Sequence, residues 1–281
     1  MKGYPTVRVL WYVSNILLVV SLGFVIYSAG WEFSTRSYLK GFSDAVIPYS
    51  HDPEQKIEAI LAWMQNGAAR HNAQDPNTID GRNPEDTLNY HQLLEVCGTA
   101  TNAFVNLAQS GGLRARRLLL LDKNGLSKHV VVETLVDNRW IVVDPAFHSI
   151  LRLTTGRPAT LEDLRKPEIF RAATQSIPNY SSIYSYESAV HIRLERIPLI
   201  GKFLRRYFDF IWPSWEVSIN WTLLLERKSF AMLVLSILLL CFALAVRLFL
   251  SWYCFSKFGI VRVRLRDKLT RAGEVLLSNS Q

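Results

Sequence analysis

Three residues that together support acyl-transfer chemistry occur in order along this chain. Cys97 is the only cysteine outside two long apolar stretches, and it lies where a loop is predicted to turn into a helix. His129 and Asp144 follow at the ends of predicted strands. In such a trio the thiolate attacks an amide carbonyl, the imidazole takes and returns the proton, and the carboxylate fixes the imidazole tautomer. This chemistry requires no metal or organic cofactor, and we expect none.

The cysteine is predicted to lie at a helix N-terminus. An apolar stripe at helical spacing follows it and ends before Gly111-Gly112, which tolerates a left-handed helix end; the stripe consists of Ala100, Phe104, Leu107 and Ala108. Unpaired N–H groups and the positive end of the helix dipole stabilise a thiolate and can later hold an oxyanion. Upstream, residues 53–70 are predicted as a helix capped by Asp52, and residues 72–86 as a loop.

The strands predict how His129 and Asp144 meet. Residues 115–121, 130–136 and 139–143 have strand character, and Asp137-Asn138 between the last two is typical of a hairpin turn. A two-residue turn pairs Val136 with Arg139 and places Asp144 across from Val131, on the face that also carries His129. A four-residue loop keeps this parity, whereas a three-residue loop puts the two side chains on opposite faces.

These segments resemble the transglutaminase-like superfamily. The pieces that carry the resemblance occur in order at residues 97–100 (CGTA), 112–116 (GLRAR), 129–133 (HVVVE) and 140–145 (WIVVDP). The resemblance covers residues 90–147 and reaches back to His51. It implies a papain-like α+β fold in which the cysteine-bearing helix packs on an antiparallel sheet that carries the histidine and aspartate. The family includes cross-linking enzymes, cysteine proteases, amidases, de-glycosylating enzymes and inactive forms; Val131 stands where many members have Trp, which leaves the substrate class open.

Other interpretations of the same residues remain. Cys97 could be a structural thiol, His129 an ordinary strand-end histidine, and Asp144 before Pro145 a turn former. His91 and His148 are rival bases, and Gln92 could donate to an oxyanion. A zinc site of Cys97, His129 and Asp144 is disfavoured, because the chain has no C-x-x-C or H-x-x-x-H pair to supply close-spaced ligands.

Two apolar stretches, residues 9–29 and 230–250, are each long enough to cross a bilayer as a helix. For the first, the alternative is a cleaved signal peptide ending near Ser28-Ala29-Gly30, although its apolar run exceeds that of signal sequences. For the second, the alternative is a buried core helix; Trp252 and Tyr253 at its end instead indicate an interfacial belt.

The distribution of charge orients these spans. The chain carries a net charge of +8, yet residues 31–228 hold 23 basic and 22 acidic residues, so almost all of the excess lies at the two ends. Basic residues beside a span mark the cytoplasmic side. We therefore expect a cytoplasmic N-terminus at residues 1–8 and a basic cytoplasmic tail at 251–281, with the middle segment outside and unable to meet nucleic acid. Arg227 and Lys228, just outside the second span, work against this orientation.

Two segments of the middle region have distinctive compositions. Residues 174–187 are rich in Ser and Tyr and are predicted to form a surface loop. Residues 191–229 mix aromatic with basic side chains, which suits either the bilayer interface or a further helix packed on the domain. The catalytic domain itself is expected at residues 30–190, between the two spans.

The sequence therefore predicts a transglutaminase-like thiol enzyme in the inner membrane of a bacterium, with Cys97, His129 and Asp144 outside. Its substrate would be a protein, peptide or envelope polymer, and its acyl-enzyme would pass to water more readily than to an amine. The alternative is a catalytically silent domain that binds peptides or scaffolds an envelope assembly. The oligomeric state is not determined by the sequence.

Overall fold

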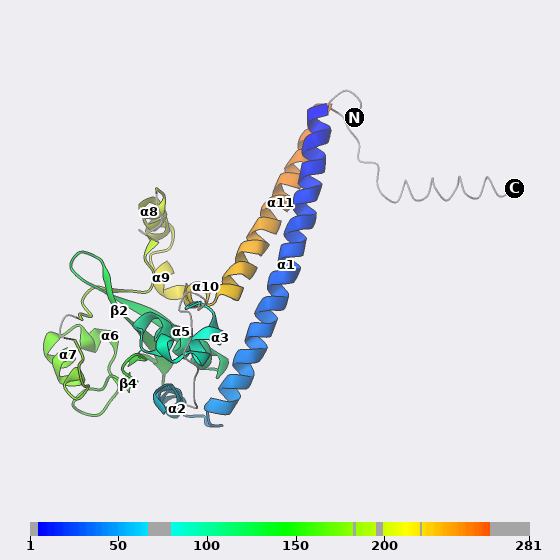
Figure 1. The fold of residues 1–281 in the computed structure, drawn as a ribbon. Coiled ribbons are helices and arrows are strands. Elements are labelled where there is room, and N and C mark those ends of the chain that lie inside the picture. The colour runs from blue at the N-terminus through cyan, green and yellow to red at the C-terminus, as the bar shows by residue number, and fades with distance from the viewer. Residues whose placement is uncertain (1–4, 67–79, 182–183, 195–198, 220, 259–281) are drawn as a thin grey trace. The chain divides into compact units, whose positions relative to one another are not determined.

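The computed structural model describes residues 5–66, 80–181, 184–194, 199–219 and 221–258. The chain divides into two compact units: residues 1–28 with 233–281, and residues 29–232. The first unit contains most of the two long helices, α1 (Pro5–Val46) and α11 (Lys228–Phe258), whereas the second is a mixed α and β domain (Figure 1).

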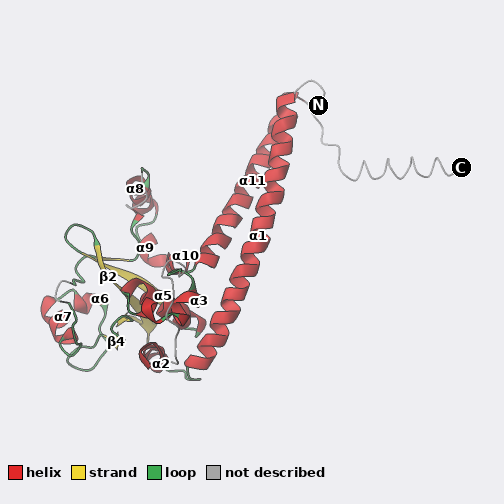
Figure 2. Ribbon diagram, viewed as in Figure 1, coloured by secondary structure: helices red, strands yellow, loops and turns green. Residues whose placement is uncertain are grey.

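The domain is built around an antiparallel sheet with the strand order β4-β3-β2-β1-β5. The main strands are β1 (Ala115–Leu121), β2 (Ser127–Val136) and β3 (Arg139–Asp144), and the edges are the short strands β4 (Ser149–Ile150) and β5 (Ala189–Val190). The helix that begins at the cysteine, α5 (Cys97–Ser110), packs against β1 and β2 (Figure 2). The predicted α+β fold, with a cysteine-bearing helix on an antiparallel sheet, is confirmed.

The β2–β3 hairpin has the predicted register. Asp137 and Asn138 adopt φ values of 45° and 62°, and Val136 pairs with Arg139 and Val132 with Val143. Both turn residues in the left-handed region are the mark of the type I′ turn, whose twist matches that of the flanking strands. Side chains of β2 with odd numbers therefore share one face of the sheet, and His129 lies on the same face as Asp144.

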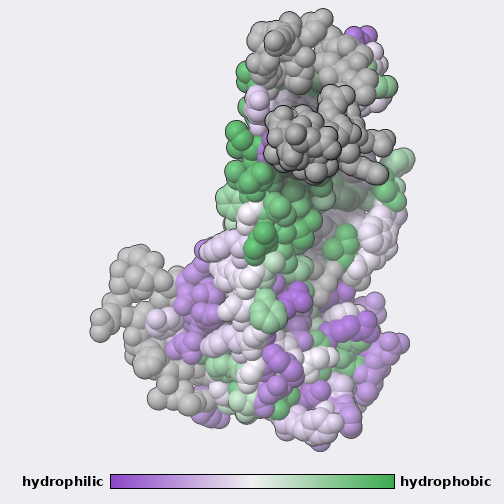
Figure 3. Space-filling model, turned by 90° about the vertical axis from the view of Figure 1, so that its right-hand side faces the viewer, coloured by the Kyte–Doolittle hydropathy of each residue, from purple (hydrophilic) through white to green (hydrophobic). Residues whose placement is uncertain are grey.

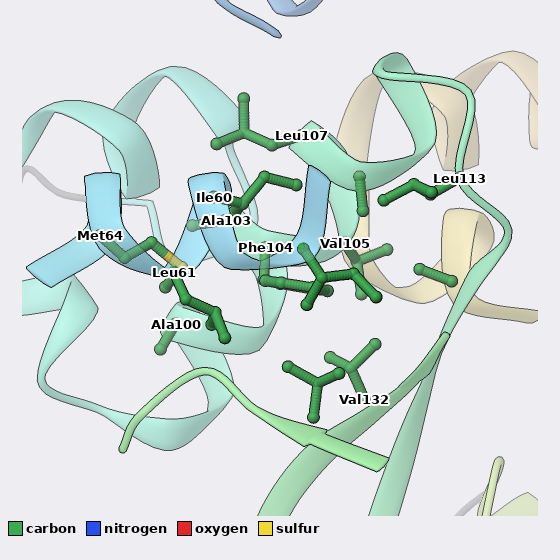
Figure 4. Close-up of a cluster of buried hydrophobic side chains, with 14 of the residues drawn as sticks. Ile60, Leu61, Met64, Ala100, Ala103, Phe104, Val105, Leu107, Leu113 and Val132 are labelled. Carbon is green, nitrogen blue, oxygen red and sulfur yellow. The ribbon is translucent and has the colours of Figure 1, made fainter. Parts of the chain in front are cut away.

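The first core lies between α5, the sheet and α2 (Pro53–Asn66) (Figure 4). Helix α2 buries four apolar residues at helical spacing: Ile57, Ile60, Leu61 and Met64. Asp52 caps this helix by accepting a hydrogen bond from the N–H of Glu54 at 2.9 Å. After the C-terminus of α5, Gly112 has φ +82°, which provides the predicted left-handed helix end. Burial of each large aliphatic or aromatic side chain here stabilises the fold by about 1.5–3 kcal/mol.

Two loop predictions hold only in part. Residues 72–79 lie outside the described part of the chain, but α3 (Pro84–Asn89) already begins within the expected loop, because Asn83 caps it and Pro84 suits a first helical position. The short α4 (His91–Leu94) follows and leads into Cys97.

The second correction concerns residues 174–187, whose described part is irregular and partly exposed, as predicted, but also contributes a buried aromatic side chain. Tyr186 is 1% exposed and belongs to a second core on the opposite face of the sheet, with Leu118, Val131 and Val142. Helices α6 (Leu161–Leu164) and α7 (Pro167–Thr174) contribute to this core. The prediction missed this burial because tyrosine counts as a polar residue through its hydroxyl, although its ring is apolar. The ring can be buried in a core when the hydroxyl finds a hydrogen-bond partner.

Helix α1 continues well beyond the predicted end of the first span at residue 29. Its last four turns carry alternating polar and apolar residues, and Leu39 is fully buried in the first core with Tyr38 and Phe42 packed against it. Residues 29–46 of α1 therefore belong to the domain, and only the preceding part has the composition of a span.

Helices α1 and α11 are each long and apolar enough to cross a membrane. Figure 3 shows hydrophobic side chains gathered over these two helices, where most large apolar residues are exposed. Within this unit the one arginine of the second apolar stretch, Arg247, donates from Nε to Oδ1 of Asn15 at 2.9 Å and stacks on the ring of Trp11. These contacts supply partners for a charge that would otherwise face an apolar environment.

A third, smaller cluster follows the last strand. The fully buried Trp215 of α9 (Trp215–Ser218) contacts Ile192 and Leu194 and is covered by residues of α8 (Gly201–Ile211). Helix α10 (Trp221–Glu226) then docks on β1, where Thr222 accepts a hydrogen bond from the N–H of Arg117 at 3.0 Å. Residues 191–226 thus contain helices packed on the domain.

Candidate active site

Cys97 is the first residue of α5 and is half-buried. Its thiol is hydrogen-bonded to the imidazole of His129 and receives the backbone N–H groups of Gly98 and Val130. The hydroxyl of Thr101, one turn along α5, donates to the carbonyl of Val130 at 3.2 Å and holds this end of the helix against β2. The predicted position at a helix N-terminus is observed, and one of the N–H groups at the thiol comes from that terminus.

His129 and Asp144 form a buried pair. Nε2 of His129 lies 2.7 Å from Oδ2 of Asp144, and the two side chains are 2% and 0% exposed. Asp144 also accepts, through Oδ1, the N–H groups of Ala146 at 3.2 Å and Phe147 at 3.4 Å. Because Nε2 is hydrogen-bonded to the carboxylate of Asp144, Nδ1 is the ring nitrogen that can bond to the thiol of Cys97. The three residues predicted from the sequence are thus brought together in one chain of hydrogen bonds.

The surroundings favour charge separation between the thiol and the imidazole. The hydrogen bond from His129 lowers the pKa of Cys97; burial opposes this effect, whereas the positive imidazolium and the two backbone N–H groups add to it. Burial opposes protonation of His129, but the hydrogen bonds to Asp144 and Cys97 and the negative charge of both outweigh it and raise the pKa to about 9. Both shifts therefore act toward a thiolate–imidazolium pair.

A wall of aromatic side chains surrounds the imidazole. Tyr184 stacks on the ring of His129 with centroids 4.3 Å apart and planes 6° from parallel, and Phe147 and Tyr180 meet it edge-on. The hydroxyl of Tyr180 donates to Oδ2 of Asp144 at 2.9 Å and lies 3.0 Å from the hydroxyl of Tyr186. The sequence analysis missed these tyrosines, although three of them within seven residues were a signal that the segment is not an ordinary loop.

The tyrosine hydroxyls act as donors toward Asp144. Burial, followed by the negative charges around it, raises the pKa of Tyr180 far above its ordinary value, and burial also raises the pKa of Tyr186. Both hydroxyls are therefore protonated in the working pH range. Tyr186 can donate to Tyr180, which donates to the carboxylate, so the relay extends the hydrogen-bond chain behind Asp144.

The thiol side of the site is open, whereas the carboxylate side is closed. Val96, immediately before the cysteine, is exposed, while Asp144 has no exposed surface. Cavities of about 620 Å³ and 210 Å³ border the aromatic wall, the first lined by Phe147 and His148 and the second by Tyr184 and Tyr186. A further cavity of about 680 Å³ is lined by Arg116, Glu133 and Trp140 and does not include the three candidate catalytic residues. A substrate carbonyl would reach Cys97 from the exposed side of the thiol.

The other candidates from the sequence lie elsewhere or have no assigned role. The exposed His91 pairs at 3.3 Å with Glu95, the residue that follows α4, and His148 lies in the turn between β3 and β4 with φ 48°. In the described part of the chain, the imidazole that contacts the thiol is that of His129. Gln92 is half-buried on α4, and its role as an oxyanion donor stays a prediction. Among the described residues no group of three or more His, Cys, Asp or Glu has the arrangement of a metal site.

The comparison with protein families agrees with this geometry. Residues 40–145 match the family model of the transglutaminase-like superfamily, a segment that contains Cys97, His129 and Asp144. The chain therefore contains a transglutaminase-like domain, of a superfamily that generally includes cysteine-dependent enzymes. Neither the comparison with curated proteins nor the comparison with solved structures gave a match.

Proposed function

We propose that this chain is a membrane-anchored thiol enzyme that attacks an amide or peptide carbonyl through a cysteine acyl-enzyme. The observation that carries the proposal is the continuous hydrogen-bond chain from the Cys97 thiol through His129 to the buried Asp144. A structural thiol needs no imidazole partner, and a strand-end histidine needs no buried carboxylate. The combination matches the needs of nucleophilic catalysis.

The reaction follows from the geometry. The Cys97 thiolate attacks the carbonyl carbon, and the resulting oxyanion is stabilised by N–H groups near the helix start. His129, protonated in the resting pair, gives its proton to the leaving nitrogen as the C–N bond breaks, which leaves a thioester and a free amine. His129 then takes a proton from water or from an acceptor amine as that group attacks the thioester, and the thiolate is released. Asp144 keeps Nδ1 directed at the reacting atoms throughout.

The membrane arrangement supports a substrate at the cell envelope. Two apolar helices would anchor the domain beside a bilayer, with the basic ends of the chain in the cytoplasm and the domain outside. Arg227 and Lys228, which argue against this orientation in the sequence, are ion-paired in the structure: Arg227 with the buried Glu32 at 3.1 Å and Lys228 with Asp80 at 2.7 Å. Their charges are therefore neutralised locally and weigh less on the orientation. This orientation predicts that a reporter fused after Ser278 lies in the cytoplasm. A reporter that works only in the cytoplasm should therefore be active in this fusion, and one that works only outside should be inactive.

The test of the enzyme uses thiol reactivity, because the substrate is not yet identified. The full chain in lipid nanodiscs is treated with a peptide-like acyl-mimic electrophile at pH 6.5, and labelling is compared among the wild type and variants. We expect Cys97→Ala to abolish most labelling, and His129→Ala to slow it to the rate of a free thiol. Cys241→Ala and Cys254→Ala are matched controls that should label like the wild type. Wild-type labelling no faster than that of a free thiol would favour the catalytically silent, peptide-binding alternative.

A further inference from the structure

Helix α8 presents a continuous hydrophobic ridge that nothing in the described part of the domain covers. Phe203 is 69% and Phe210 is 87% exposed, and the other exposed apolar residues of the ridge are Leu199, Ile200, Tyr207 and Ile211. Leu199 and Ile200 precede the helix, and at 100° per residue its four ridge positions, Phe203, Tyr207, Phe210 and Ile211, lie within one arc of the helix surface. Exposed apolar residues concentrated on one face, rather than scattered, mark an interaction surface.

The opposite face of α8 is anchored to the domain, so the direction of the ridge is determined. Leu204 and Phe208 pack on the third core around the buried Trp215. Arg205 reaches Glu216 at 3.2 Å, and the indole N–H of Trp215 donates to Asp209 at 2.9 Å. Helix α8 therefore has an inward face in contact with protein and an outward face that is available to a partner.

The border of the ridge carries positive charge. Lys202 and Arg206 are exposed and follow each other by one turn along one side of the apolar arc. The acidic residue of the helix, Asp209, is occupied by Trp215 and by Arg205 at 3.8 Å. The outward surface thus combines aromatic rings, aliphatic side chains and two cations that have no ion-pair partner among the described residues, which is the composition of helices that lie in the headgroup region of a bilayer.

We infer that α8 lies on the surface of a bilayer that contains anionic phospholipid, with its ridge at the boundary of headgroups and acyl chains. The chain itself brings the bilayer within reach: residues 212–227 separate α8 from the apolar helix α11. This connection spans at most roughly 55 Å when fully extended. Lys202 and Arg206 lie where they can meet lipid phosphates. The contact would hold the domain near envelope substrates, yet it is independent of whether Cys97 is catalytic.

The test measures the environment of the ridge in the full chain. Cys97, Cys241 and Cys254 are replaced by Ala, and single cysteines are introduced by Phe203→Cys, Tyr207→Cys and Phe210→Cys for spin labelling in nanodiscs. Leu235→Cys on the apolar surface of α11 is the lipid-exposed reference, and Lys123→Cys, in the turn between β1 and β2, is the water-exposed reference. Electron paramagnetic resonance measures how accessible each spin label is to oxygen, which enters lipid, and to a nickel chelate, which stays in water. The ratio of the two accessibilities is compared among the positions.

We expect the three ridge positions to give ratios close to that of Leu235→Cys in nanodiscs that contain phosphatidylglycerol. Lys202→Gln together with Arg206→Gln should reduce the lipid-bound fraction, since each basic residue near an anionic surface is worth about a five-fold change in partition. Ratios equal to that of Lys123→Cys would overturn the inference. Low accessibility of the ridge labels to both oxygen and the nickel chelate, with dipolar broadening between labels in discs that hold two copies of the chain, would also overturn the inference. That result would indicate a protein contact. Three ridge positions keep the result interpretable if one variant fails to fold.

Discussion

Replacing Tyr180 with Phe tests whether the aromatic wall supports the charge of Asp144. The substitution keeps the ring that meets His129 edge-on and removes only the hydroxyl, which donates to Oδ2 of Asp144 at 2.9 Å. The same oxygen accepts the bond from His129 at 2.7 Å. Tyr180→Phe therefore removes one donor to a fully buried carboxylate and also leaves the Tyr186 hydroxyl without the partner it has at 3.0 Å.

The expected loss of stability can be worked from these contacts. A hydrogen bond to a charged group contributes about 1.5–3 kcal/mol, and a neutral one about 0.5–1.5 kcal/mol. Their joint loss should lower the free energy of unfolding by about 3 kcal/mol. For a unit of this size, residues 29–232, that corresponds to a fall in Tm of roughly 6–12 °C. The matched control is Tyr184→Phe, which keeps the ring stacked on His129 and should change the stability by less than about 0.5 kcal/mol.

The same variant makes a prediction about His129. Without the hydroxyl, the negative charge of Asp144 is shared among fewer donors, so the carboxylate holds the imidazolium proton more strongly. The pKa of His129, already raised to about 9, should rise further. Titration of ring-labelled histidine by NMR, with the full chain in nanodiscs, measures this shift. A pKa of His129 that falls, or an equal loss of Tm in Tyr184→Phe, would refute the role assigned to Tyr180.

Three further predictions concern charge and backbone. Because the pKa of His129 is raised, its protonated form stabilises the fold fully below its unfolded value near pH 6.5, and this contribution is lost as the pH rises through about 9. The Tm of the wild type should therefore fall more between pH 7 and 10 than that of His129→Gln. Arg227→Met leaves the buried Glu32 with Arg36 as its remaining ion-pair partner at 2.6 Å, and should cost about 1.5–3 kcal/mol in chemical denaturation. Asn138→Val forces a β-branched residue into φ 62° and should lower the stability by about 1–2 kcal/mol, whereas Asn138→Gly should not.

Much of the candidate site follows from local patterns in the sequence. The helical stripe after Cys97 predicts the start of α5, because a repeat of 3.6 residues is set by neighbours along the chain. The hairpin register follows from two turn residues and the alternation of strand side chains, which place His129 and Asp144 on one face before any tertiary contact is known. The order and spacing of these segments were sufficient to indicate the transglutaminase-like domain found at residues 40–145.

Only the tertiary structure revealed which distant residues complete the site and the domain. Residues 174–187 have a polar composition, and only their contacts show that Tyr180 and Tyr184 enclose the His129–Asp144 pair. The extension of α1 to Val46 depends on burial of Leu39 in the first core, and the neutralisation of Arg227 depends on Glu32, nearly 200 positions away. Periodicity reports which face of an element is buried, but not which partner covers it. The sequence by itself thus predicted Cys97 as the candidate nucleophile and the common face of His129 and Asp144, whereas long-range packing decided which side chains hold the carboxylate of Asp144 and which ones pair with Arg227.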